Sequence, residues 1–425
     1  HEKWVVGYGH ASVAEHATVH LGIERVSRLF SSLLELSNEY LSFTEFSQRY
    51  QKPRRGDYFI PHELRDKPGL LNEYVALQDS LYEIYTELNA GLIEHISTLR
   101  EATSESAIEK LAFEDARYAL SLATLTNLGL TGNARAIEDA LTKLLSSKYK
   151  EARERAMEMK EEVAEAVPTL VKYAKESPYI VETRRELESL EYGFPRMESA
   201  SHREEGGTVR LLDFTGKGSS DPQTRALEKI VRSVIFAYSG LSYDEASLVS
   251  VRKGQQFLLD VFRKSVQRMS KHENPLGALR LVSYEAEFTV SEACWHQLLR
   301  HRKVSWLPQE PTVHTGFEIP PRIKEAGLEG LLLQAVRMSE RLYGRLVGEG
   351  LREAASYTVT NAHLRRVIGS FDLWELYHLI NLRMSQGAQW DIRNIVSLLT
   401  EEVSRYHPDL VKPAIERVLP GVKAD

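Results

Sequence analysis

Apolar residues recur at spacings of three and four along most of the chain, and charged residues fill the opposite positions. This pattern predicts amphipathic helices, because three to four residues make one helical turn. The predicted helices cover residues 12–41, 70–100, 106–128, 133–176, 222–238, 252–270, 327–356 and 372–404. The chain is therefore expected to be predominantly helical.

Strands are predicted at fewer places, where apolar and polar residues alternate. Thr208–Thr215 and Arg280–Val290 alternate clearly, whereas strand and helix compete for Ala17–Val26. Together with the helices, these segments predict an α+β fold in which small mixed or antiparallel sheets are flanked by long helices.

A polar stretch between about residues 176 and 207 predicts a linker, because it contains "ESPY", "YGFP" and "SHREEGG". It places a domain boundary near residue 205. The first domain is then 1–205, with its linker from about 176, and the second is 206–425.

The two domains are expected to be tandem copies of one another. When residues 9–50 are written above residues 271–313, their apolar positions and a "VS" before a helix coincide. In this register His10, Ser12 and Glu15 of the first copy correspond to His272, Asn274 and Gly277 of the second. Further along, Ser37–Glu39 correspond to Arg300–Arg302, and Ser47 and Arg49 correspond to Glu310 and Thr312. Each copy keeps polar groups that the other lacks.

The first copy is expected to be incomplete at its N-terminus. The second copy has about 64 residues between Thr208 and His272, whereas nine precede His10. By this count roughly 55 residues of the first copy lie upstream of His1, which is itself not a methionine.

Composition narrows the classes of function. The 425 residues contain 54 Lys and Arg and 60 Asp and Glu, a formal net charge of −6, so no general attraction for DNA or an anionic membrane is expected. No apolar run approaches the roughly 20 residues that span a bilayer. We therefore expect a soluble cytoplasmic protein that binds anionic ligands through local groups of arginines.

The single cysteine, Cys294, excludes a disulfide framework and a cysteine-built zinc site, and no metal is predicted. Its apolar neighbours favour a buried, inert thiol, and the alternative is a catalytic nucleophile.

Two segments have the residue types of a phosphate site. Ser47 and Arg49 follow one predicted helix, and Arg135 begins another, where a guanidinium and the helix N-terminus both favour an anion. The alternative for each arginine is a surface ion pair. In "HASVAEH", Ser12 and Glu15 also match a capping box, which needs no ligand.

The motifs together resemble those of the flavin-dependent thymidylate synthase (ThyX) family. They are H-x-S-x-x-E-H at His10–His16, S-x-x-x-x-S-Q-R-Y at Ser42–Tyr50, N-A-R at Asn133–Arg135, R-H-R-x-x-S at Arg300–Ser305, and N-L-R followed by A-Q-W-D-I-R at Asn381–Arg393. The family joins R-H-R and S-x-R in one run. Here that run is split between the two copies, so the resemblance implies a ThyX-like domain present twice.

The resemblance implies synthesis of dTMP from dUMP, with methylenetetrahydrofolate as carbon donor, FAD as cofactor and NADPH as reductant. Arg393 would stabilise the ionised uracil ring. The residues implied for dUMP are Glu45, Ser47, Gln48, Arg49, Arg135, Gln297 and Arg300; those implied for FAD are His10, Ser12, Glu15, His301, Arg302, Asn381 and Arg383. Asn381, Arg383 and Arg393 are expected on one helix, with solvated helix residues as the alternative for the two arginines.

Complementary loss between the copies predicts one composite active site. The phosphate-binding set survives in the first copy and the flavin-binding set in the second. Since the family forms homotetramers with sites built between subunits, a homodimer, that is, a pseudo-tetramer of ThyX-like domains, is expected. Two alternatives stay open: a non-catalytic nucleotide- or flavin-binding relative, and a flavin-dependent transferase or reductase on a related pyrimidine nucleotide.

Overall fold

The computed structural model describes residues 11–49, 52–99, 104–169, 171–189, 204–270 and 272–418. The chain divides into two compact units, each built from several segments. Unit 1 contains His1–Gly206, Ser291–Arg300 and Glu310–Leu364; unit 2 contains Gly207–Val290, His301–Gln309 and Arg365–Asp425. The predicted division into copies at residue 205 concerns the sequence and stays a prediction.

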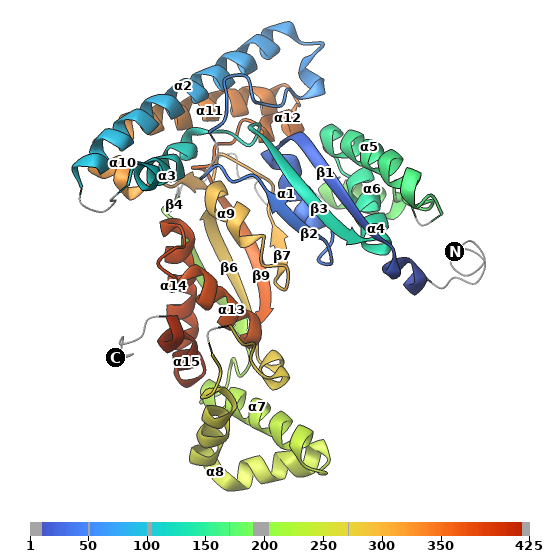
Figure 1. The fold of residues 1–425 in the computed structure, drawn as a ribbon, viewed down its shortest axis with the longest axis vertical. Coiled ribbons are helices and arrows are strands. Elements are labelled where there is room, and N and C mark those ends of the chain that lie inside the picture. Colours follow the sequence, from blue (N-terminus) through green and yellow to red (C-terminus); the bar gives the residue numbers. More distant parts are fainter. Residues whose placement is uncertain are drawn as a thin grey trace. The chain divides into compact units, whose positions relative to one another are not determined.

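Unit 1 is built on an antiparallel sheet in the order β1-β3-β2 (Figure 1). Its strands are β1 (Thr18–Ser27), β2 (Ser42–Glu45) and β3 (Leu125–Asn133). Buried residues alternate with more exposed residues along β3, as expected for a strand whose one face packs on the core. A second, parallel pair joins β4 (Glu204–Glu205) to β8 (Gly316–Phe317).

Helices and short 3₁₀ turns (η) surround this sheet. They are η2 (Ala11–His16), α1 (Arg28–Ser37), η3 (His62–Leu64), α2 (Pro68–Thr98), α3 (Glu105–Ala116), η4 (Arg117–Ala119), α4 (Ala134–Leu145), α5 (Lys150–Ala166), α6 (Pro178–Ser189), α9 (Glu292–Leu298), α10 (Pro321–Glu325), α11 (Glu329–Gly348) and α12 (Arg352–Ser356). The long helices α2 and α11 pack side by side (Figure 1).

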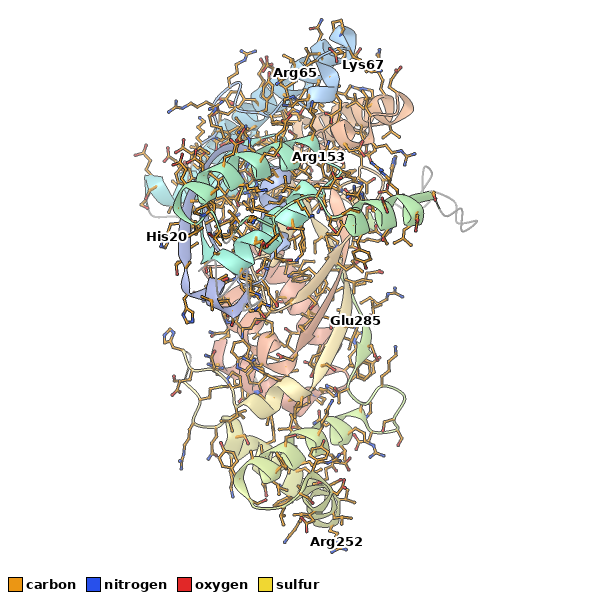
Figure 2. The ribbon with its side chains drawn as sticks, turned by 90° about the vertical axis from the view of Figure 1, so that its right-hand side faces the viewer. His20, Arg65, Lys67, Arg153, Arg252 and Glu285 are labelled. Atoms are coloured by element: carbon orange, nitrogen blue, oxygen red, sulfur yellow. The ribbon has the colours of Figure 1, made fainter. Side chains whose placement is uncertain are left out.

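Unit 2 is built on a four-stranded sheet in the order β5-β6-β9-β7. Its strands are β5 (Thr208–Phe214), β6 (Ser283–Ser291), β7 (Ser305–Pro308) and β9 (Leu364–Asp372); its helices are α7 (Pro222–Tyr238), α8 (Tyr243–Val266), η5 (Gly277–Leu281), α13 (Leu373–Arg383), α14 (Trp390–Ser404) and α15 (Pro408–Val418). Figure 2 shows Glu285 on β6 and Arg252 at the far end of the α7–α8 pair. A non-helical Gly254 bends α8.

The two halves of the sequence repeat the same order of elements. In each, a strand runs into a serine N-cap and a helix: Ser27 Oγ accepts from Phe30 N, and Ser291 Oγ accepts from Cys294 N. In each, the central strand β3 or β9 runs into a capped helix, and β2 or β7 pairs with that strand. An α+β fold in which one arrangement of elements occurs twice is thereby confirmed.

The serine caps make Ser27 equivalent to Ser291, which confirms the predicted coincidence of the "VS" before a helix. The predicted pairing of His10 with His272 differs from this register, because carried forward it would pair Ser27 with Thr289. The two residues of difference arise because apolar periodicity fixes which face a helix buries and leaves the positions of its caps open.

Several predicted helices were too long. Residues 12–41 contain β1 before α1, and residues 106–128 end as a helix at Ala116 before β3 begins. Residues 133–176 and 372–404 each form two helices, and the predicted linker contains α6. The helices predicted over 70–100 and 222–238 and the strand over 208–215 are confirmed within two residues. No described helix combines the length and apolarity that a membrane span requires.

Candidate functional site

A buried group of two arginines and two glutamates lies in unit 1. The side chain of Arg300, which follows α9, forms an ion pair with Glu45 and also contacts Glu35 Oε1 at 2.9 Å. On the other side of Glu45, Arg28 Nη1 donates to Oε1 at 2.6 Å. Two predicted dUMP residues, Glu45 and Arg300, are thus brought together although 255 positions separate them.

The two carboxyl groups differ in protonation. Burial raises the pKa of Glu35 to about 8, even though Arg300 opposes that shift. Burial also acts on Glu45, but Arg28 and Arg300 outweigh it and lower the pKa of Glu45. At neutral pH the group therefore contains two guanidinium ions, one carboxylate and one neutral carboxyl, which leaves it one positive charge in excess.

The motif turn after β2 presents three predicted dUMP residues. Ser47 Oγ accepts from Arg49 N at 3.2 Å, and the Gln48 Oε1 accepts from Asn361 Nδ2 at 3.3 Å. The Arg49 guanidinium lies 2.6 Å from Glu114 Oε2, in an ion pair that is mostly buried. The guanidinium expected to hold a phosphate is therefore already neutralised within the protein.

Arg135 is the second residue of α4, as predicted, and Asn133 caps that helix. Its Nη1 donates to Glu15 Oε1 at 2.6 Å, and both side chains are about half exposed. This geometry is that of an exposed ion pair between a predicted dUMP residue and a predicted FAD residue. Ser12 is exposed on η2, and His10 lies outside the described residues.

The helix α9 ends before the R-H-R triplet begins. Gln297 is on α9, where its Nε2 donates to Ala293 O at 3.2 Å, but Arg300 lies beyond the helix end at Leu298. Arg302 is exposed two residues later. Cys294, on the same helix, is fully buried, as its apolar neighbours predict.

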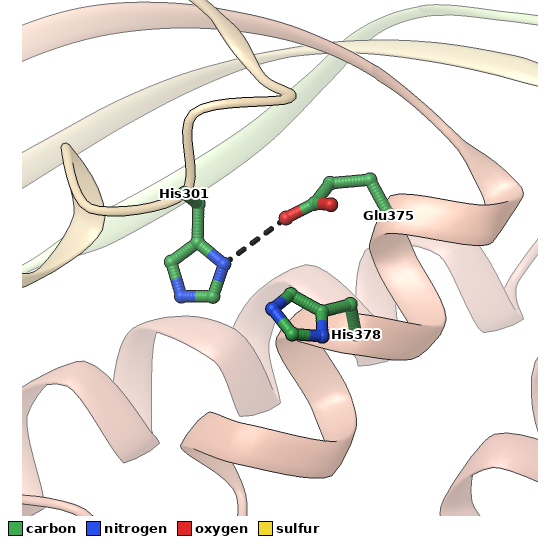
Figure 3. A group of neighbouring side chains, drawn as sticks. All are labelled: His301, Glu375 and His378. Carbon is green, nitrogen blue, oxygen red and sulfur yellow. Dashed lines mark hydrogen bonds and ion pairs between the residues drawn. The ribbon is translucent and has the colours of Figure 1, made fainter. Parts of the chain in front are cut away.

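In unit 2, the predicted FAD residues His301 and Arg383 contact each other. Arg383 Nε donates to His301 Nε2 at 2.9 Å, so the ring proton must be on Nδ1, which donates to Glu375 Oε1 at 3.0 Å (Figure 3). Burial, reinforced by Arg383, lowers the pKa of His301 to about 3. Burial raises the pKa of Glu375 to about 7. His301 is therefore a neutral ring whose two nitrogens are both used.

His378 stands one turn after Glu375 and faces His301 (Figure 3). The ligand atoms of these three side chains lie within 4.8 Å of one another, a spacing that admits a metal ion. Arg383 occupies His301 Nε2, however, and Lys303 and Arg280 add positive charge near Glu375. These cations oppose a bound metal ion and favour an anionic ligand.

An aromatic and cationic patch adjoins His378. Trp374 stacks on His378 with ring centroids 6.3 Å apart, and the Lys303 Nζ and the Arg280 guanidinium lie 4.5 and 4.7 Å from the Trp374 centroid. This combination of a flat aromatic surface and positive charge suits a phosphate-bearing aromatic ligand.

One expectation for the C-terminal motif was wrong. Asn381 and Arg383 lie on α13, which ends at Arg383, whereas the half-buried Arg393 lies on α14. The break between the two helices includes Gly387, a weak helix former, and apolar periodicity on either side does not reveal such a break. The roles of these residues stay predictions.

Sequence reasoning missed several residues of these groups: Arg28, Glu35, Glu114, Glu375 and His378. Two signals could have found some of them. Glu35 lies between two leucines of an apolar segment, and Glu375 and His378 are spaced by three residues on a predicted helix.

Comparison with known proteins finds some relatives that match nearly the whole chain and others that match part of it. A UPF0159 protein of Thermoplasma acidophilum is 27% identical over 444 residues, covering 95% of this chain and 85% of that protein. A flavin-dependent thymidylate synthase of Clostridium tetani is 29% identical over 171 residues, covering 40% of this chain and 68% of that protein. A similar enzyme of Pyrococcus furiosus is 29% identical over 36% of this chain and 71% of its own length.

Among solved structures, a UMP/dUMP methylase from Streptomyces cacaoi matches 52% of this chain and 100% of its own, at 15% identity and a TM-score of 0.42. The profile of the thymidylate synthase complementing protein family, Thy1, matches residues 1–169 and 230–409, one segment in each copy. The resemblance read from the motifs is confirmed, and the chain belongs to the Thy1 family.

Proposed function

We propose that the chain methylates dUMP to dTMP, with methylenetetrahydrofolate as carbon donor and FAD as cofactor. The observation that carries the proposal is the ion pair between Arg300 and Glu45 in unit 1. It joins the R-H-R motif of one sequence copy to Glu45, at the end of β2 and inside the S-x-x-x-x-S-Q-R-Y motif of the other copy, and the family has these motifs in one run. A nucleotide-binding set composed of residues from both copies is what complementary loss predicts.

The residues of unit 2 fit FAD by charge and shape. Arg383, Lys303 and Arg280 surround the rings of Trp374 and His378, and FAD combines a pyrophosphate with flat aromatic rings. When bound and reduced, FAD supplies the hydride that completes the methyl group. The chain's own part is to hold the cofactor: Glu375 fixes His301, and His301 in turn fixes the Arg383 guanidinium.

In unit 1, the proposed role of Arg300 and Gln297 is to bind the nucleotide. Arg393 is proposed, from the resemblance alone, to stabilise the uracil ring as N3 loses its proton. The homodimer, NADPH as reductant, an origin by gene duplication and a cytoplasmic location also stay predictions from the resemblance and from composition.

The test combines binding and turnover. Protein reconstituted with FAD should show a flavin absorbance spectrum that dUMP perturbs. With methylenetetrahydrofolate present, it should release tritium from C5-labelled dUMP. Failure of the protein to take up FAD would contradict the proposal.

A matched pair of variants tests the composite set. Arg300→Lys keeps a charge beside Glu45 but loses the guanidinium fork, so we expect at least tenfold weaker dUMP binding. Arg55→Lys is the control, because Arg55 is exposed and pairs with Asp79 and Glu83. Normal dUMP binding by Arg300→Lys would count against the composite set.

A second candidate is a non-catalytic nucleotide- and flavin-binding protein. The observation that favours it is the closed arrangement of His301, whose two ring nitrogens are both bonded within unit 2. Binding of FAD and dUMP without any release of C5 tritium would select this candidate. Turnover of UMP or of another pyrimidine nucleotide in place of dUMP would instead favour a flavin-dependent transferase or reductase that acts on a related pyrimidine nucleotide.

A further inference from the structure

A cavity of about 350 Å³ lies in unit 1 beside the motif turn, between that turn and the start of β3. We name it the Arg25 cavity. Its lining includes Arg25, Phe46, Gln48, Lys52, Arg54 and Asp57. Its volume is in the range of pockets that hold small molecules. Among the predicted dUMP residues, the lining includes Ser47 and Gln48 and does not include Arg49, Arg135 or Arg300.

The charged residues of the lining are three cations and one carboxylate, so the cavity has a surplus of two positive charges. Asp57 is shared: its Oδ1 lies 3.2 Å from Arg25 Nη1, and its Oδ2 accepts from Arg54 N at 3.1 Å. Within the described ranges, the side chains of Lys52 and Arg54 form no ion pair. A surplus of two charges matches the dianion of a phosphate monoester.

Gln48 adds a buried donor to the cavity. The residue is 8% exposed, and its Oε1 accepts from Asn361 Nδ2. Its Nε2 has no hydrogen-bond partner among the residues that the structure describes. A buried donor without a partner costs about 1 to 3 kcal/mol, so an acceptor on a ligand would relieve an existing penalty.

The backbone of Arg25 is strained in a way typical of ligand sites. Its φ of 53° makes it the one residue other than glycine, in the described part of the chain, with a left-handed backbone. The residue lies where the pairing of β1 with β3 shifts register between Ile23 and Val26. Arg25 N donates to Asn127 Oδ1 at 2.7 Å, which holds this conformation. Such strain persists where surrounding contacts fix it, commonly at ligand-binding positions.

Phe46 gives the cavity an aromatic wall. Phe46 is 49% exposed. Its backbone N donates to Asn127 O at 2.9 Å, which holds the residue against β3. An exposed ring in a cationic cavity provides a stacking surface for a base. The cavity therefore suits a nucleotide better than inorganic phosphate.

We propose that the Arg25 cavity binds a nucleoside monophosphate, with Arg25, Lys52 and Arg54 at the phosphate and Phe46 at the base. The identity of the nucleotide as dUMP rests on the proposed function. The inference differs from the family resemblance in its cations. Arg49 and Arg135 are each paired with a glutamate, whereas Lys52 and Arg54 form no ion pair within the described ranges and Arg25 shares Asp57 with the backbone of Arg54. Lys52, Arg54 and Arg25 then determine affinity for the phosphate.

The experiment measures the affinity of the full-length chain for dUMP by titration calorimetry. The test variant is the double substitution Lys52→Gln, Arg54→Gln, which changes two exposed side chains and leaves the buried ion pairs intact. The control is Arg55→Gln, the next residue, which pairs with Asp79 and Glu83 and does not line the cavity. Deoxyuridine serves as the ligand without a phosphate.

We expect the double variant to bind dUMP at least tenfold more weakly, because two charge-assisted contacts are lost. Its affinity for deoxyuridine and the dUMP affinity of Arg55→Gln should stay as in the wild type. Unchanged dUMP affinity in the double variant, or an equal loss in the control, would overturn the proposal.

A wild-type chain that does not bind dUMP would contradict the proposed function without deciding this inference. The same titrations are then made with UMP, dCMP and AMP. Binding of one of them that the double variant weakens tenfold supports the cavity, and binding of none overturns it. A third variant, Gln48→Leu, should also weaken the bound nucleotide, because it removes the buried donor while keeping the side-chain volume similar.

Discussion

Arg300 and Glu45 form an ion pair in which the glutamate side chain is 1% exposed. Breaking such a pair leaves a buried charge with fewer partners. We expect Arg300→Met to destabilise the chain by about 2 kcal/mol, since Arg28 still contacts Glu45. Urea unfolding measures the loss, and Arg302→Met, on an exposed neighbour, is the control. An equal effect of the two substitutions would show that Arg300 is not a buried anchor.

Glu35 should make stability depend on pH. Its pKa is raised to about 8 in the folded chain against roughly 4.3 when unfolded, so its contribution is complete below pH 4 and is lost as pH rises through 8. Glu35→Gln keeps a neutral group and removes this loss. The variant's melting temperature should equal that of the wild type near pH 4.5 and exceed it at pH 8.5. A constant difference at both pH values would contradict the assignment.

His301 should make the stability of the folded chain depend on pH in the acid range. Its pKa is lowered to about 3 in the folded chain against roughly 6.5 when unfolded, so its contribution is present above pH 6.5 and is lost as pH falls through 3. His301→Gln can still accept from Arg383 and donate to Glu375, yet does not titrate. Its unfolding free energy should fall less between pH 7 and 4.5 than that of the wild type. His20→Gln, on an exposed histidine, gives the baseline, and a slope equal to the wild type would refute the prediction.

The central strand of unit 2 requires a glycine at one position. A Cβ at Gly369 would lie 2.6 Å from Trp306 Cζ3 and 3.1 Å from Phe288 Cε2. We expect Gly369→Ala to cost about 1 to 3 kcal/mol, because both rings would have to shift. Gly330→Ala, in α11 with open space around it, should instead stabilise by about 0.5 to 1 kcal/mol. Thermal unfolding of the two variants would show whether the contacts at Gly369 set the difference.

The periodic pattern predicted helices well where one face alone is buried, and it failed where apolar spacing is ambiguous. Leu122, Leu125 and Leu128 are spaced by three, which extended the predicted helix over residues 106–128. In the structure the alternation of β3 decides, because pairing with both β1 and β2 satisfies its backbone. Long-range pairing of this kind leaves no local signal.

The motifs of the candidate site could be predicted from the sequence, but the residues that pair with them could not. The turn at Ser47 and the start of α4 at Arg135 follow from local sequence. That Arg49 would face Glu114, or Arg135 face Glu15, depends on packing between segments far apart in the chain. The cations of the Arg25 cavity belong to no motif, since a register shift in β1 and a turn at Asp57 place them.

Because its backbone is left-handed, the residue at position 25 cannot be optimal for both thermal stability and ligand affinity. Glycine there would remove the steric penalty and raise stability by roughly 1 kcal/mol. It would also delete one cation of the cavity. A lineage selected only for heat resistance would drift towards glycine or asparagine at this position. Retention of arginine would mark the lineages in which binding has governed the choice.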